Sequence, residues 1–197
     1  MDKYQQMTDQ ELVKSYVSGC NEAFDCILER YQDRLYQYIF FSVRNSDLAD
    51  DIFQETFIKA IVNLRQGSYT ESGRFYSWLT RIAHNLIIDQ YRQESNISMV
   101  SHDDYVGDNL SDENLSESYA EAELVNEQTL RDVKRLMEHL PENQREVVFM
   151  RYYQDLSFKE IADITGVSIN TSLGRMRYAV MNMRKMAKEY GISLEMM

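Results

Sequence analysis

Apolar residues recur at alternating steps of four and three along residues 169–187, which is the spacing of one face of an α-helix. They are Ile169, Leu173, Met176, Val180, Met183 and Ala187. A shorter helix is predicted just before this one, because Ser157 and Glu160 have capping-box spacing and Gly166 can take the left-handed conformation that ends a helix. Ser168 is then placed to cap the second helix. The pattern indicates either a helix-turn-helix motif or an ordinary helical hairpin.

Helical periodicity extends over most of the chain. Thr8 and Glu11 predict a capping box for a short helix that ends near Gly19, and Ser46 is the predicted cap of a later one. The longer predicted helices cover residues 21–44, 47–65, 74–92, 120–140 and 141–153. Residues 66–73 are a turn-rich loop, and the predicted fold class is all-α.

Composition agrees with a folded helical protein. The 197 residues include one proline, seven glycines and 44% hydrophobic residues, enough for packed cores. The apolar runs are too short to span a bilayer and no signal segment opens the chain, so we expect a cytoplasmic protein. Cys20 and Cys26 lack CxxC spacing and the three histidines are scattered. We therefore expect free thiols, no metal site and no cofactor.

The net charge of −11 is unevenly distributed. Ten acidic residues and no lysine or arginine lie between Gln93 and Leu130, whereas the helix after Ser168 is rich in bases. Residues 96–118 are also rich in Ser, Asp and Asn without apolar periodicity, which predicts a flexible acidic linker rather than a surface loop. The predicted organisation is two small helical domains, 1–95 and 119–197, joined by residues 96–118.

Polar residues form a second face on the predicted helix over 47–65. They are Asp50, Asp51, Gln54, Glu55 and Lys59. Such a face is either merely solvated or a docking surface for an elongated basic partner. Periodicity alone favours solvation.

Two further sets of polar residues are typical of nucleic-acid binding. On the helix over 74–92, together with the preceding loop, the candidates are Tyr69, Arg74, Arg81, Asn85 and Arg92. Arginines beside aromatic rings suit the binding of single-stranded nucleic acid. Phe75 and Trp78 themselves are better explained as core residues. On the last helix the residues off the apolar stripe are Asn170, Thr171, Arg175, Arg177 and Tyr178. A polar, basic second helix of a helix-turn-helix motif suits a DNA major groove.

Sequence motifs for catalysis are missing. The chain has no glycine-rich phosphate loop, no nucleophile motif and no metal-ligand spacing. Asp50 and Asp51 are adjacent, so on a helix they point to different sides and make no acid–base pair. We expect neither an enzyme nor a small-molecule substrate.

Three segments together resemble the bacterial sigma-70 family, in particular its extracytoplasmic-function (ECF) group. DLADDIFQETFIKAI (47–61) is similar to region 2.2, and RFYSWLTRIAHNLIIDQYR (74–92) to regions 2.3 and 2.4. LPENQREVVFMRYYQDLSFKEIADITGVSINTSLGRMRYAV (140–180) is similar to region 4. The resemblance covers about residues 20–95 and 125–190, and the order and spacing of the three segments make it specific.

The resemblance implies a factor that binds core RNA polymerase and lends it promoter recognition. The polar face from Asp50 to Lys59 would then meet helices of the largest polymerase subunit, which reverses the preference for solvation. The helix over 74–92 and the loop before it would bind the −10 element. The loop would hold one flipped base, and Asn85 would contact the adjacent base of the non-template strand. The last helix would bind the −35 element as duplex. The resemblance also implies a cognate anti-sigma factor as a separate protein.

The chain departs from the family at Leu173 and Gly174, where members commonly carry a basic residue and a serine. Leu173 falls on the apolar stripe and is expected in the core. We then expect Asn170, Arg177 and Tyr178 to contact the bases. Thr171 and Arg175 are expected to contact DNA phosphates. The acidic linker would avoid DNA and follow a basic channel of the polymerase.

Two other functions fit parts of the sequence. A stand-alone helix-turn-helix regulator would bind duplex DNA without polymerase, but would not need the surface for single-stranded DNA. An inhibitor whose acidic segment imitates nucleic acid would act without promoter specificity. The sigma-factor hypothesis accounts for both ends of the chain.

Overall fold

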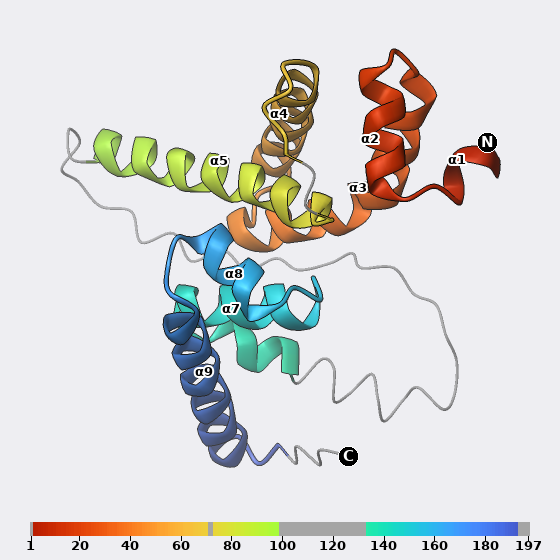
Figure 1. Cartoon of the computed structure of the whole chain (residues 1–197). Helices are drawn as coiled ribbons and strands as arrows, with labels where there is room; N and C mark the ends of the chain where they lie inside the picture. Colours follow the sequence, from red (N-terminus) through yellow and green to blue (C-terminus); the bar gives the residue numbers. More distant parts are fainter. Residues whose placement is uncertain (1, 71–72, 99–132, 193–197) are drawn as a thin grey trace.

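The computed structural model describes residues 2–70, 73–98 and 133–192, and every regular element in them is helical, as predicted. The N-terminal half contains α1 to α5 and the C-terminal half contains α7 to α9 (Figure 1). Their bounds are α1 Asp2–Gln5, α2 Asp9–Val17, α3 Asn21–Val43, α4 Ser46–Arg65, α5 Phe75–Ser98, α7 Glu142–Tyr152, α8 Phe158–Thr165 and α9 Ile169–Glu189. Residues 133–138 are also helical.

The capping boxes predicted at both ends of the chain are confirmed. At α2, the backbone amide of Glu11 donates to Thr8 Oγ1 at 3.4 Å, and the Thr8 amide donates to the Glu11 carboxylate at 2.8 Å. Ser157 and Glu160 repeat the arrangement at α8, with distances of 3.3 and 2.9 Å. Gly166 ends α8 at a φ of 67°, in the left-handed region that glycine adopts without steric cost.

Two predicted boundaries are wrong. Asn45, not Ser46, caps α4: its side-chain oxygen accepts from the Leu48 amide at 3.0 Å, and Ser46 is already helical. Asparagine caps helices as well as serine does, because its side-chain oxygen can also accept a hydrogen bond from a backbone amide in the first turn. The helix predicted to end at Arg92 continues to Ser98, and so enters the segment predicted as linker. Residues 99–132, which hold the rest of that linker and the start of the helix predicted over 120–140, lie outside the described residues.

The N-terminal half is assembled around α3. This helix packs against α2, α4 and α5, and Leu35 and Ile39 on its buried face are inaccessible to solvent. Aromatic rings fill the space between helices; Phe24 lies edge-on to Phe57 at 6.1 Å between ring centroids. The core thus leaves the opposite sides of α4 and α5 available to solvent.

In the C-terminal half, α9 packs against both α7 and α8. Its fully or almost fully buried residues are small: Ser172, Ala179 and Ala187. Small side chains allow helix axes to approach closely, which suits the packing of α9 on two other helices. The structure confirms the two predicted helices, α8 and α9, and the predicted caps at Ser157, Gly166 and Ser168.

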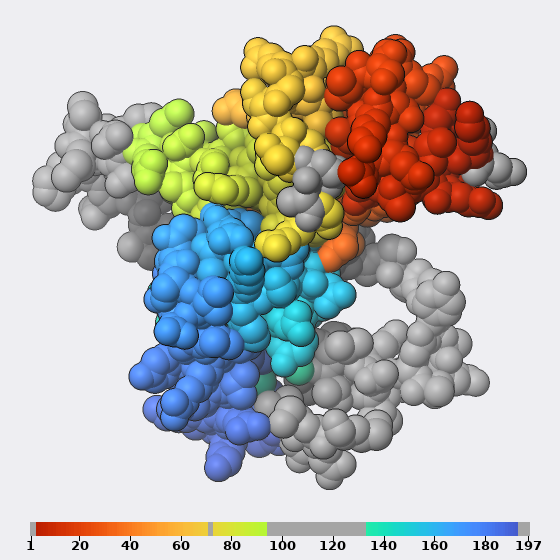
Figure 2. Space-filling view, in the orientation of Figure 1, coloured from red at the N-terminus to blue at the C-terminus, as the bar shows by residue number. Residues whose placement is uncertain are grey.

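The two halves share one continuous core. In space, α5 packs on α8 and α3 packs on α7, and the C-terminal half lies directly against the N-terminal half (Figure 2). At the centre, the rings of Phe41 on α3 and Phe149 on α7 stack with centroids 4.0 Å apart. Phe149 also lies 6.3 Å from the ring of Tyr38. The folded stability of each half therefore includes contacts with the other.

Phe149→Ala is expected to lower the free energy of unfolding by about 3–5 kcal/mol, the usual cost of removing a buried aromatic side chain. Because Phe149 touches both halves, chemical denaturation followed by circular dichroism should show one transition at lower denaturant. The control is Tyr152→Ala on the same helix, whose side chain is 72% exposed and should cost less than about 0.5 kcal/mol. Equal losses in the two variants would contradict a shared core.

Candidate functional site

The predicted polar face of α4 is exposed on the side of the helix away from the core. All five predicted residues lie there: Asp50, Asp51, Gln54, Glu55 and Lys59. The Lys59 ammonium pairs with Glu55 at 3.1 Å, one turn away. Partial burial, together with a hydrogen bond to Asp50, raises the pKa of the neighbouring Tyr36. With three carboxylates and one ammonium, the face carries a net negative charge.

Two apolar residues continue this face and were missed by the sequence analysis. Ile58 is 60% exposed and Val62 is 44% exposed. Both follow Asp51 and Glu55 at helical spacing, and that spacing could have revealed them. The exposed side of α4 is therefore acidic toward its N-terminus and has two apolar side chains toward its C-terminus.

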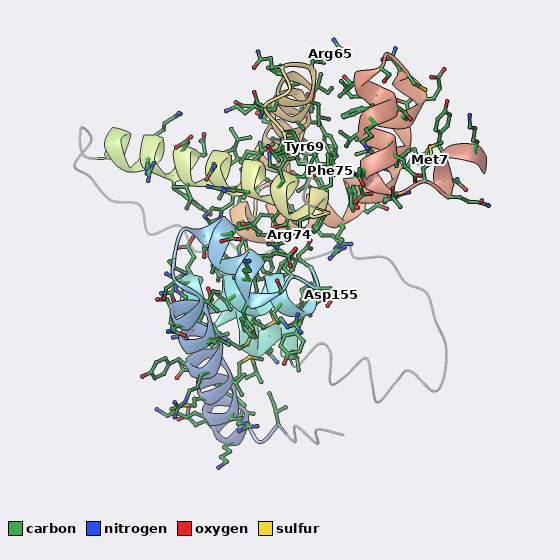
Figure 3. The ribbon with its side chains drawn as sticks, viewed as in Figure 1. Met7, Arg65, Tyr69, Arg74, Phe75 and Asp155 are labelled. Carbon is green, nitrogen blue, oxygen red and sulfur yellow. The ribbon has the colours of Figure 1, made fainter. Side chains whose placement is uncertain are left out.

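A basic surface runs along α5. Arg81, Asn85 and Arg92 are exposed, and their spacing of four and seven residues puts them on one side of the helix. Arg74 precedes α5 and is directed toward α8, where it pairs with Asp163 at 3.9 Å (Figure 3). Arg92 pairs with Asp89 at 3.5 Å. The predicted residues of α5 thus share a face, and one end of it meets the C-terminal half.

Tyr69 is placed differently from the arginines. Its ring packs 4.5 Å from that of Trp78 and 5.6 Å from that of Phe75, at the start of α5 (Figure 3). Phe75 is buried, which confirms its assignment to the core, and Trp78 is partly buried. Tyr69 is therefore part of an aromatic cluster under the loop rather than a free ring beside it.

On α9 the structure brings together four of the five predicted DNA-binding residues. Asn170, Thr171, Arg177 and Tyr178 are exposed on the N-terminal half of the helix. Arg175 is half-buried and lines the cavity between the two halves of the protein.

The predicted apolar stripe of α9 is wrong at its beginning. Leu173 is 44% exposed and Ile169 is 45% exposed, whereas Ser172, one residue away, is fully buried. Successive residues of an α-helix are about 100° apart around the helix axis. The stripe of buried residues is therefore rotated about this axis by about 60° from the predicted apolar stripe. The buried residues of α9 are a serine and two alanines, whereas the larger apolar residues at its beginning face outward. Leu173 therefore lies on the same outer side as Asn170 and Arg177.

Gln154 joins the two halves through hydrogen bonds that no local sequence pattern indicates. It is completely buried. Its Nε2 donates to the backbone carbonyl of Arg34 at 3.1 Å, its backbone carbonyl accepts from the Arg34 guanidinium, and its Oε1 accepts from the Tyr76 hydroxyl. The Arg34 guanidinium also lies over the Tyr76 ring, 4.2 Å from its centroid.

Tyr38, His84 and Glu146 form a second polar contact between the halves. The Tyr38 hydroxyl donates to Glu146 Oε1 at 3.2 Å and lies 3.1 Å from His84 Nδ1, which is 3.0 Å from the same carboxylate oxygen. Burial, and to a smaller degree the Glu146 carboxylate, holds the pKa of Tyr38 well above its ordinary value. His84 and Glu146 line an open cavity of about 250 Å³ together with Arg175.

Neither a metal site nor a membrane helix is found in the described parts of the chain. No three His, Cys, Asp or Glu residues there are grouped to hold a metal ion. Cys20 and Cys26 are free thiols; Cys20 is only half-buried, and its sulfur lies 3.0 Å from the Tyr4 hydroxyl. None of the helices over 2–70, 73–98 and 133–192 is long and apolar enough to cross a bilayer.

Comparison with known proteins identifies both halves. Residues 27–97 match the model of Sigma-70 region 2, and residues 130–172 match that of Sigma-70, region 4. The ECF RNA polymerase sigma-E factor of Haemophilus influenzae is 30% identical over 179 residues, which cover 87% of this chain and 91% of that protein. The chain belongs to the ECF sigma factor family. Sigma factor SigW of Bacillus subtilis is 27% identical over 195 residues, 93% of this chain and 99% of that protein.

Two solved structures share the fold. The sigma factor RpoE from Bartonella quintana, in complex with the anti-sigma factor NepR, superimposes with a TM-score of 0.67 at 22% identity, over 84% of this chain and 96% of that one. CnrH in complex with the cytosolic domain of CnrY superimposes with a TM-score of 0.62 at 22% identity. The match covers 93% of this chain and 99% of CnrH.

Membership of the family settles the general function. The chain is a sigma factor that directs transcription initiation at promoters, and sigma factors are not enzymes. These matches do not favour a stand-alone helix-turn-helix regulator. In this sigma factor α4 and all of α5 except Ser98 lie within region 2, whereas α7 and α8 lie within region 4.

The contact between the halves should weaken at high pH. Burial raises the pKa of Tyr76 to about 12 from its ordinary value of 10.0, against the opposing effect of Arg34. Below pH 10 the hydroxyl is neutral in both the folded and the unfolded chain, so its contribution to stability is complete. Between pH 10 and about pH 12 the Tyr76 hydroxyl loses its proton only in the unfolded chain. The free energy of unfolding therefore falls as the pH rises through this range.

Urea denaturation from about pH 9 to 11 checks this expectation. Tyr76→Phe lacks the hydroxyl and should lose less stability over that range than the wild-type sigma factor. At neutral pH the variant should be less stable, because Gln154 Oε1 loses its donor in a buried site. Parallel pH profiles for the two proteins would show that Tyr76 is not responsible.

Proposed function

We propose that this sigma factor works through three separate surfaces. The exposed side of α4 binds core RNA polymerase, the basic side of α5 with the loop before it binds the melted −10 element, and the outer side of α9 binds the −35 element as duplex. We assign residues 1–95 and 119–197 to the two DNA-binding domains and 96–118 to the linker, whose first three residues continue α5. The protein acts in the cytoplasm, where the polymerase and the promoters are.

The observation that carries the proposal is the exposure of all three surfaces in a fold whose core is elsewhere. The acidic and apolar side of α4 suits a basic helical partner, because complementary charge guides association and apolar contacts stabilise the complex. Arg81 and Arg92 suit phosphates, and Asn85 has both donors and acceptors for a base. Flipping a base out of the DNA stack costs a few kcal/mol. Binding of the flipped base in the loop offsets this cost, so the DNA can open without ATP.

Both promoter elements can be bound at once only if the two halves separate. The elements are named for positions about 25 base pairs apart, roughly 85 Å of duplex at about 3.4 Å per step. The contact of α5 with α8 brings the two DNA-binding surfaces much closer than that. Separation breaks the contacts of Gln154 and Glu146, and it frees Arg175 from the cavity and Arg74 from its ion pair.

An anti-sigma factor is a further proposed partner. The sigma factor RpoE from Bartonella quintana, which has a similar fold, was solved in complex with the anti-sigma factor NepR. We propose that a separate protein of this class regulates the present chain.

Promoter binding should depend on polymerase. The sigma factor with core RNA polymerase is expected to shift promoter DNA and to give run-off transcripts from a randomised promoter library, whereas the protein alone gives neither. The reason is that polymerase must hold the halves apart and the strands open. Tight binding of duplex promoter DNA by the protein alone would instead support the stand-alone regulator.

Reversing charge on α4 should weaken polymerase binding. Asp51→Lys combined with Glu55→Lys is expected to lower affinity for core polymerase about tenfold, or about 1.4 kcal/mol. The matched control is Asp25→Lys with Glu29→Lys, an exposed pair of acids at the same spacing on α3. Fluorescence anisotropy with labelled protein measures both affinities, and thermal melting checks that each variant folds. Equal weakening by the two pairs would mean that only net charge matters and would refute the assigned surface.

A further inference from the structure

The outer side of α9 presents apolar surface among polar residues. Leu173 is 44% exposed, and Ile169, one turn earlier, is 45% exposed. Leu173 follows Asn170 by three residues and precedes Arg177 by four, so the three side chains are neighbours on one side of the helix. The buried residues of α9 are Ser172, Ala179 and Ala187, so Leu173 lies outside the core.

The space beside Leu173 is open. Gly174, the next residue, has no side chain, and a Cβ placed there would have no neighbouring atom within 4 Å. A flat or concave partner can therefore approach the helix closely at this point. The two positions where the chain departs from its family thus combine an exposed apolar side chain with a gap next to it.

The surrounding charge indicates which partner fits. Arg177, Arg184 and Lys188 are exposed along the same side of α9. A second copy of this surface would bring like charges together, whereas a polyanion would be attracted. Within a DNA major groove, the apolar group that distinguishes one base pair from the others is the C5-methyl of thymine. An exposed leucine beside an arginine therefore suits a thymine near a guanine.

We propose that Leu173, supported by Ile169, contacts a thymine methyl in the duplex element that α9 reads. This inference rests on the proposed binding of the −35 element by α9. Leu173 and Arg177 are about 6 Å apart along the helix axis at 1.5 Å per residue. That length matches about two base-pair steps of 3.4 Å, so the thymine lies within about two base pairs of the guanine contacted by Arg177.

Removing single methyl groups from the promoter tests the contact. The probe is a promoter selected from a randomised library by the holoenzyme, with each thymine of the −35 element replaced in turn by deoxyuridine, which lacks only the methyl. One replacement should weaken holoenzyme binding about threefold to fourfold, the effect expected for one buried methyl. For holoenzyme carrying Leu173→Ala, thymine and uracil at that position should be bound equally.

Met181→Ala is the matched control, because Met181 is a 53% exposed apolar residue farther along the same helix. This variant should keep the full preference for thymine over uracil. Thermal melting of Leu173→Ala should match the wild-type protein, since the side chain lies outside the core. An unchanged preference for thymine in Leu173→Ala, or no methyl-sensitive position at all, overturns the inference.

Arg177→Ala separates this inference from the proposed function. If Arg177→Ala relaxes the −35 preference but Leu173→Ala keeps its preference for thymine, only the methyl contact is refuted. If neither variant affects any promoter, the assignment of α9 to the −35 element fails as well, and the inference fails with it.

Discussion

Burial of Gln154 and Phe149 between the two halves is the constraint on which the rest of the structure depends. A buried amide must have its hydrogen-bonding groups satisfied, and the side chain of Gln154 bonds to the Arg34 carbonyl on α3 and the Tyr76 hydroxyl on α5. Phe149 stacks on Phe41 in the same interface. Together these contacts fix α7 and α8 against the N-terminal half, and so determine which sides of the helices are left for other molecules.

Those remaining sides differ in chemistry. The outer side of α4 is acidic and apolar, that of α5 is basic, and that of α9 is basic with an apolar patch at its start. Each suits a different partner, and no two of the proposed surfaces lie on one helix. The same closed arrangement engages Arg74 and Arg175 at the contact between the halves, so closure opposes the promoter binding that we propose for these two residues.

Local interactions made the helices predictable. Both capping boxes, the glycine that ends α8 and the cap of α9 involve residues within a few positions of one another, and the structure has all of them. The five residues on α4 were predicted as one face and are exposed as one face. Predictions were wrong where neighbours compete for one role, as Asn45 and Ser46 do for the cap of α4.

The sequence by itself determined the helices, most of their ends, the polar faces and the resemblance to sigma factors, because these depend on short-range spacing and residue chemistry. Tertiary structure alone decided that the halves share a core, that Tyr69 packs on Trp78, and that Leu173 faces outward. The reason is that close helix crossings favour small residues such as Ser172 and Ala179, and a hydrophobic pattern cannot show which side of a helix will meet such a crossing. Partners as distant in the chain as Arg34 and Gln154 are likewise brought together only by the packing of whole helices.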